Sequence, residues 1–326
     1  MATYKGIQGF TIQNLSADPS NPIEGQVWYN STSNVWKVEE LTTAGSWASG
    51  NNMNTARAGP GAAGTQTEAL AFGGEIPPTT NATEEYNGTS WTNNPTGLNT
   101  ARYELAGVGT QTAALAFGGA TPADTSATEE YDGSTWTNNP TGLNTARYIL
   151  AGAGIQTAAL AFGGSASATV TGATEEYNGS TWTSSNSLNT ARTNIAGCGT
   201  QTVGLAFGGA NAVPSPIGAT EEYDGTSWTS SNSLNTARSG LVGAGIQTAA
   251  LAFGGATPTL TGATEEYDGT NWASNPTGLN TARRSFAGAG TQTSALGFGG
   301  YNGSFLAVTE EWTGAGAAVT KTITVS

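Results

Sequence analysis

A motif of 45 or 46 residues recurs along most of this chain, and it constrains the fold more strongly than any other feature. Each copy contains, in fixed order, an Asn-Thr-Ala-Arg box, a Gln-Thr pair, a Phe-Gly-Gly box and a Thr-Glu-Glu segment that ends in an aromatic residue. The phenylalanines of the Phe-Gly-Gly boxes are Phe72, Phe117, Phe162, Phe207, Phe253 and Phe298. A period this regular indicates a repeat protein in which each copy forms the same structural unit.

The pattern within one copy predicts short strands. Read as a strand, Ala113–Phe117 places Leu115 and Phe117 on one face, together with Ala113, and Ala114 and Ala116 on the other. Both faces are apolar and must be buried against other parts of the protein. Identical sheets can stack closely when the bulky face of one packs on the alanine face of the next. Gly118 and Gly119 end this strand, and an Asn-Gly or Asp-Gly pair before the next tryptophan is typical of a tight turn between strands. We therefore expect an all-β chain of four-stranded sheets stacked in a ring.

Three of these features together resemble the kelch repeat: diglycine after the second strand, tyrosine in the third and tryptophan in the fourth. The resemblance covers residues 54–312 and implies a β-propeller whose blades are the repeats. A residue that recurs in every blade is interpreted as structural, and an identically placed arginine most simply pairs with a glutamate or a backbone carbonyl nearby. The structural set includes Arg102, Arg147, Arg192, Trp136, Trp182, Trp228, Phe117, Gly118 and Gly119.

The number of blades is open between two counts. The third-strand aromatic position recurs seven times if Leu41 is included, and Trp47 keeps register with the later tryptophans, which favours seven blades. Only six Phe-Gly-Gly boxes exist, so the seventh blade would take residues 10–15 and 26–29 as its first strands and 319–325 as its outer strand. The alternative is six blades with an N-terminal extension. We divide the chain into an N-terminal segment, residues 1–53, and one propeller domain, residues 54–326.

The residue inventory argues against catalysis. The chain has no histidine, which removes Ser-His and Cys-His pairs, the usual zinc sites and the copper site of kelch-fold galactose oxidase. The pair Glu129-Glu130 recurs in each copy, and neighbours in a strand point to opposite faces, so it is interpreted as scaffold rather than as a glycosidase pair. No calcium-loop pattern is present. We predict no catalytic site, no metal and no cofactor.

Charge and cysteine content limit the partners and the location. A net charge of −13 with only ten basic residues disfavours nucleic-acid binding, and no apolar run is long enough to predict membrane insertion. Residues 1–10 lack the pattern of a secretory signal, and the one cysteine, Cys198, cannot form an intramolecular disulfide. This combination suits a protein that is made and assembled in a bacterial cytoplasm and released without a signal.

The copies differ from one another in two segments, the residues just after each box arginine and the loop after each diglycine. In an up-and-down blade both segments emerge on the same side of the disc, so one face of the propeller is diverse. Loops carry function more often than strands do, although exposed loops also drift in sequence. Candidate binding residues on this face are Tyr103, Glu104, Tyr148, Arg284, Tyr301 and Asn302.

A second resemblance lies near the start of the chain. Residues 13–31 read Gln-Asn-Leu-Ser-Ala-Asp-Pro-Ser-Asn-Pro-Ile-Glu-Gly-Gln-Val-Trp-Tyr-Asn-Ser. This segment is similar to one found in tail and other virion proteins of tailed phages, notably those that infect marine bacteria. The resemblance implies a virion component, a tail fibre or appendage, with other virion proteins or sister subunits as partners through residues 1–50. The variable face would then bind a host-surface glycan. The alternatives are a purely structural capsid or tail decoration, and a cellular lectin-like propeller.

Overall fold

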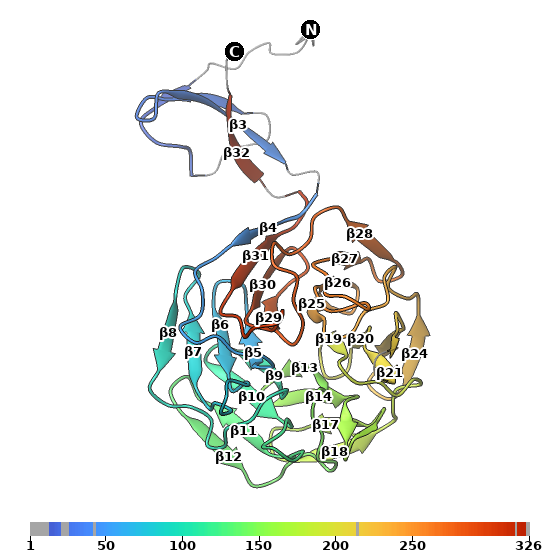
Figure 1. Ribbon diagram of the computed structural model, residues 1–326. Helices are drawn as coiled ribbons and strands as arrows, with labels where there is room; N and C mark the ends of the chain where they lie inside the picture. The colour runs from blue at the N-terminus through green and yellow to red at the C-terminus, as the bar shows by residue number, and fades with distance from the viewer. Residues whose placement is uncertain (1–12, 21–25, 42–43, 213–214, 317, 324–326) are drawn as a thin grey trace. The chain divides into compact units, whose positions relative to one another are not determined.

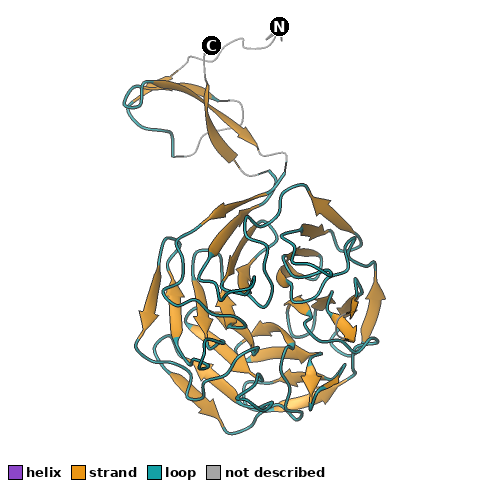
Figure 2. Cartoon of the chain, viewed as in Figure 1, coloured by secondary structure: helices purple, strands orange, loops and turns teal. Residues whose placement is uncertain are grey.

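The computed structural model describes residues 13–20, 26–41, 44–212, 215–316 and 318–323. These residues form an all-β structure of strands joined by turns and loops (Figures 1 and 2). Within these ranges, no helix is of a length and apolarity that would let it cross a lipid bilayer. The chain folds into two compact units, one made of residues 1–45 and 314–326 and the other of residues 46–313.

The second unit is a β-propeller of six four-stranded antiparallel blades. From inner to outer strand, blade 1 is β5 (Gly61–Gly64), β6 (Ala69–Phe72), β7 (Thr83–Tyr86) and β8 (Trp91–Asn94); blade 2 is β9 (Ala106–Thr110), β10 (Ala113–Phe117), β11 (Thr128–Tyr131) and β12 (Trp136–Asn139); blade 3 is β13 (Ala151–Ile155), β14 (Ala158–Phe162), β17 (Thr174–Tyr177) and β18 (Trp182–Ser185). Blade 4 is β19 (Ala196–Gly199), β20 (Gly204–Phe207), β23 (Thr220–Tyr223) and β24 (Trp228–Ser231); blade 5 is β25 (Val242–Ile246), β26 (Ala249–Phe253), β27 (Thr264–Tyr267) and β28 (Trp272–Asn275); blade 6 is β29 (Ala287–Gly290), β30 (Ser294–Phe298), β31 (Thr309–Thr313) and β4 (Ser46–Ser49).

Two-stranded hairpins extend the diglycine loops of blades 3 and 4. They are β15 (Ser165–Ala166) with β16 (Thr169–Val170), and β21 (Ala210–Ala212) with β22 (Ser215–Pro216). The inner strands β5, β9, β13, β19, β25 and β29 surround the centre of the ring, and β29 lies against β5, so the six blades close on themselves (Figure 1).

The strands predicted near both ends of the chain are present in the described residues. The structure contains seven four-stranded sheets, but only six of them form the ring. The seventh sheet belongs to the first unit and has the order β1 (Gln13–Leu15), β2 (Val27–Asn30), β3 (Val35–Leu41) and β32 (Ala318–Ile323). Its first two strands run parallel, unlike the strand pairs of the blades. The ring therefore matches the alternative count of six blades with an extension. Of the strands expected for a seventh blade, residues 10–12 and 324–325 lie outside the described residues.

The spacing of Trp47 from the later tryptophans predicts a place in a seventh blade, and this prediction is wrong. Trp47 lies on β4, which pairs with β31 and places Trp47 opposite Trp312 as the outer strand of blade 6. The last blade thus combines strands from both ends of the repeat array. For the same reason the compact units divide the chain after residues 45 and 313, and not after residue 53.

A hydrogen bond between blades repeats at every interface of the ring. The indole Nε1 of each outer-strand tryptophan donates to the Oγ1 of a third-strand threonine in the preceding blade, at 2.9 Å in all six cases. Trp136, for example, donates to Thr83, and Trp91 of blade 1 donates to Thr309 of blade 6. Each tryptophan ring also packs on the Phe-Gly-Gly phenylalanine of the preceding blade, with centroids 4.7–5.0 Å apart.

The Gln-Thr turns supply a second set of bonds between blades. Gln111 Nε2 donates to the carbonyl oxygens of Ala69 and Tyr86 in blade 1, at 3.0 and 2.7 Å. The other five glutamines of these turns make the equivalent pair of bonds, including Gln66 of blade 1 to blade 6. These side chains therefore hold the ring together and are not free surface groups.

Glycine is required where the phenylalanine of one blade meets the inner strand of the next. A Cβ on Gly107 would lie 2.4 Å from the Phe72 ring, and one on Gly152 would lie 2.6 Å from Phe117. Real Cβ atoms do not approach other atoms this closely, so a side chain here would push two blades apart. The small residues of the inner strands are thus fixed by the large residues of the neighbouring blade.

The box arginine is fully buried in every blade and forms an ion pair with the first glutamate of the Thr-Glu-Glu segment. In blade 2, Arg102 Nη2 lies 3.2 Å from Glu129 Oε1, and Arg102 Nη1 donates to the carbonyl oxygen of Gly118 at 3.1 Å. Glu129 also accepts the backbone N–H of Asn99. Burial lowers the pKa of Arg102 to about 10, against the opposing effect of Glu129, so the arginine stays charged at neutral pH.

Two fragments test the role of β4 in closing the ring. A fragment of residues 46–313 keeps six complete blades and should melt cooperatively as a monomer. A fragment of residues 51–313 lacks β4, loses the bond from Trp47 to Thr264 and exposes the edge of β31. We expect this shorter fragment to melt about 10 °C lower and to aggregate, because a large buried aromatic is lost and an unpaired edge invites pairing. Equal melting temperatures in calorimetry, with both fragments monomeric, would contradict the assignment of β4.

Candidate binding site

The two variable segments emerge at the same end of each blade. In blade 2, the register pairs Ala106 with Phe117 and Phe117 with Thr128, so the residues before β9 and the loop after β10 lie at one edge. The Gln-Thr turn follows Thr110 at the other edge. We call the edge that carries the residues after the box arginines and the diglycine loops the variable face, and the other edge the opposite face.

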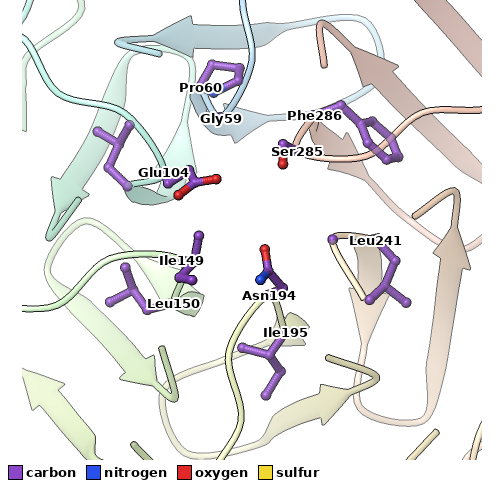
Figure 3. Close-up of a pocket in the computed structure, with 12 residues that line it drawn as sticks. Gly59, Pro60, Glu104, Ile149, Leu150, Asn194, Ile195, Leu241, Ser285 and Phe286 are labelled. Carbon is purple, nitrogen blue, oxygen red and sulfur yellow. The ribbon is translucent and has the colours of Figure 1, made fainter. Parts of the chain in front are cut away.

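Six equivalent residues form a closed ring of backbone hydrogen bonds at the centre of the variable face. Each lies two positions after its box arginine, and its N–H donates to the carbonyl oxygen of the equivalent residue in the preceding blade, at 2.6–3.3 Å. The members of this axial ring are Gly59, Glu104, Ile149, Asn194, Gly240 and Ser285 (Figure 3). Because the bonds run from blade 1 back to blade 6, the axial ring has no free end.

The backbone conformation of the axial ring favours glycine. All six residues have φ between 47° and 63°, the left-handed region, where a residue with a side chain is disfavoured by about 1–2 kcal/mol. Gly59 and Gly240 meet this requirement, and Asn194 tolerates it. Glu104, Ile149 and Ser285 do not suit it, so the backbone alone does not account for these three side chains.

An open depression of about 440 Å³ lies over the axial ring. The side chains of Glu104, Asn194 and Ser285 point toward its centre from blades 2, 4 and 6 (Figure 3). Among the described residues, none of these three side chains has a hydrogen-bond partner in the protein. The blades between them contribute Gly59, Ile149 and Gly240, which offer no polar side chain. A carboxylate, an amide and a hydroxyl group thus converge on one point from alternate blades.

Two further depressions adjoin the first, since Glu104 and Ser285 line all three. One, of about 590 Å³, is lined by Glu75, Arg284, Tyr301 and Phe305 as well. The other, of about 790 Å³, is lined by residues of the diglycine loops of blades 4 and 5, with Asn194 and Arg284 at its inner side. Tyr301 and Phe305 contact each other edge to face with centroids 5.6 Å apart.

The structure brings together some of the residues that the sequence singled out. Glu104, Arg284 and Tyr301 line one depression. Tyr103 lies close enough to Glu104 and Glu75 for their charges to add to the effect of burial in raising its pKa. Tyr148 lies on the same face, where its N–H donates to Ser165.

Asn302 does not share this arrangement, and other residues do. Asn302 is exposed, its N–H donates to Ser304, and it lines none of the three depressions. The candidate binding residues chosen from the sequence do not include Asn194, Ser285, Glu75 or Phe305. The position two residues after each arginine is the signal that would have found Asn194 and Ser285, because it selects the whole axial ring.

Glu104 is the acidic residue of this face whose pKa is shifted most. Burial is the main cause that raises its pKa to about 7, the charge of Glu75 raises it further, and Arg284 opposes both. Near neutral pH the protonated form of this carboxyl group is therefore favoured far more than in a free glutamate. In the part of the chain that the structure describes, no group of three or more acidic or cysteine side chains is placed to hold a metal ion.

No protein-family model matches the chain, and no curated protein matches its sequence.

The pKa of Glu104 makes stability depend on pH. The folded state holds a proton more tightly than the unfolded state, whose glutamate has an ordinary pKa of 4.5, so stability should fall as pH rises from about 4.5 through 7. For a partly exposed group we expect a loss of on the order of 1 kcal/mol between pH 5 and pH 8. Glu104→Gln should remove this loss in urea titrations, while Glu68→Gln on the opposite face should keep it. An unchanged pH dependence in Glu104→Gln would contradict the assignment.

Proposed function

We propose that the protein is a non-enzymatic virion component of a tailed phage, a tail fibre or appendage, that binds a host-surface glycan through the variable face. One observation carries the binding part of this proposal. The repeated polar side chains are engaged in bonds within and between blades, whereas the variable ones around the axis are left to solvent beside open depressions. A surface whose sequence is not needed by the fold is free to be selected for a ligand.

The shape and chemistry of the variable face favour a carbohydrate. The depressions are shallow and open, and they bring tyrosines, an exposed arginine and several carboxylates to one surface. Tyr301 offers a ring face on which the apolar side of a sugar can stack, and Arg284 offers several fixed donors to hydroxyl or acidic groups. Shallow sites of this kind bind weakly, and many copies on one particle would convert weak binding into firm attachment.

The virion part of the proposal rests on the N-terminal resemblance and is supported by the division into two units. The first unit joins strands from both ends of the chain, β3 and β32, in one sheet. Its Asp18 accepts hydrogen bonds from Trp28 Nε1 at 3.0 Å and Asn30 Nδ2 at 2.8 Å and pairs with Lys37. A separate unit of this kind suits attachment to other virion proteins or sister subunits, while the propeller is presented to the host. The likeness of its repeats to kelch repeats is part of the same proposal.

A second function, a structural capsid or tail decoration, is favoured by one observation on the opposite face. Ile155, Val203 and Ile246 are 56%, 45% and 55% exposed at the Gln-Thr turns of blades 3, 4 and 5. Three neighbouring blades thus present large apolar side chains on this face. Ile155 and Ile246 come directly before the turn glutamine, where the other four blades carry threonine, and Val203 comes two residues after the glutamine of blade 4. In that reading this face, and not the variable face, would contact another virion protein.

Two sets of substitutions separate these functions. Tyr103→Ala, Tyr148→Ala, Arg284→Ala and Tyr301→Ala together should reduce binding to host-envelope polysaccharide at least tenfold in a surface-binding assay. This reduction is expected because the stacking rings and the fixed donors are removed from exposed or partly exposed positions. The matched control is Ile155→Thr with Ile246→Thr, which places on the opposite face the threonine found in blades 1, 2, 4 and 6.

The control should bind the polysaccharide normally. If the first set binds normally and the isoleucine set fails to join the particle, the decoration function replaces glycan binding. Circular dichroism melts of both variants show whether the fold is kept.

A further inference from the structure

The axial depression has the symmetry of a particular chemical group. Glu104, Asn194 and Ser285 come from alternate blades of a six-membered ring, so their side chains approach the axis in a roughly threefold arrangement (Figure 3). Each of them offers an oxygen acceptor: a carboxylate, an amide carbonyl and a hydroxyl group. Among the described residues, none of the three side chains has a hydrogen-bond partner within the protein, and Arg284 acts on Glu104 only through its charge.

A primary ammonium group matches this arrangement. It has three N–H donors in threefold symmetry and no acceptor, so one such group on the axis can donate to all three oxygens at once. Sugar hydroxyl groups have one donor each and would leave two of the acceptors unused. A carboxylate or phosphate has no donor to offer and would meet the charge of Glu104.

The surrounding charges favour a cation as well. Glu75 lies near Glu104, and Tyr103 is affected by Glu75, Glu104 and Asp124, while Arg284 is the cation that faces Glu104. Arg284 is exposed and is not among the residues over the axial ring, so it leaves the axis itself to the acceptors. An arriving ammonium would be attracted to an ionised Glu104 in a partly buried setting, where screening by water is reduced.

Three residues of the axial ring, Glu104, Ile149 and Ser285, are not those that the backbone would select. Glycine fits the left-handed conformation in blades 1 and 5, and a Cβ at Gly59 would lie 2.8 Å from the Glu104 side chain. Glu104 and Ser285 hold the same conformation in spite of their side chains. An unfavourable residue that is kept at a solvent-facing position points to a use for its side chain.

We propose that the axial depression is a subsite for the free amino group of an amino sugar, held by Glu104, Asn194 and Ser285. The proposal rests on the proposed glycan-binding function and names the class of glycan. The outer depressions, with Arg284 and Tyr301, would hold the neighbouring sugars of the same chain. Acetylation of the amine removes the charge and two of the three donors, so the subsite should discriminate against N-acetylated sugars.

Titration calorimetry of the full chain at pH 7 with three probes tests the subsite. The probes are a glucosamine tetramer, its fully N-acetylated form and its N-trimethylated form, which keeps the charge but has no N–H. We expect the free-amine tetramer to bind at least tenfold more tightly than either of the other two. Glu104→Gln should remove this preference, and Asn194→Ala and Ser285→Ala should each reduce it.

Glu68→Gln is the matched control, because it makes the same substitution on the opposite face and leaves the axial depression unaltered. It should keep the preference for the free amine. Equal binding of all three tetramers would overturn the amine subsite while leaving glycan binding intact. Equal binding of the free and trimethylated forms would show attraction by charge alone and overturn the threefold arrangement. A lack of binding by all three tetramers, with envelope polysaccharide still bound, would also overturn the subsite, whereas loss of polysaccharide binding as well would overturn the proposed function.

Discussion

The hydrogen bond from a tryptophan indole to a threonine hydroxyl of the preceding blade is the interaction on which the propeller depends. It recurs six times with the same length. The bond from Trp91 of blade 1 to Thr309 of blade 6 closes the ring. Both partners are buried, so neither can exchange the bond for water without opening the interface. The phenylalanine packed on the indole and the glycine beneath that phenylalanine follow from the same contact. Because the repeats are nearly identical in sequence, they form nearly identical interfaces, and six such interfaces close into a ring.

The same constraint separates the residues of the chain by role. Within a blade the buried arginine and glutamate form an ion pair, and both also make hydrogen bonds to the backbone of nearby turns. Removing one partner of such a pair would leave an unpaired charge in the interior. Residues in these positions are fixed by their neighbours in every copy. The residues after the arginine face the axis and solvent, where the ring imposes a backbone conformation but leaves the side chain free. Differences between copies gather there for that reason.

Much of the fold could be predicted from the repeat because local pattern and period are sequence properties. Ala113–Phe117 forms the expected strand, buried on both faces, and the diglycine follows it. The blade of Trp47 could not be predicted in this way. The repeat period indicates that Trp47 lies on an outer strand, but it does not indicate which blade that strand joins. The outer strand of blade 6 pairs with a strand more than two hundred residues away, and tertiary closure decides this. In the candidate site, Glu104 and Arg284 were found by variation between copies. Asn194 and Ser285 were not, because a comparison of the copies does not show that the position two residues after each box arginine forms a hydrogen-bonded ring at the axis.

Hydrogen exchange of the indole N–H groups, followed by NMR of the intact protein, tests most directly whether the six interfaces form one closed and cooperative ring. The nine tryptophans give nine indole signals, of which six belong to the inter-blade bonds. If the ring is one cooperative unit, these six should exchange slowly and with a common free energy equal to that of global unfolding. Fast exchange at one or more of them, with free energies well below global unfolding, would show that blades open singly and would contradict the account.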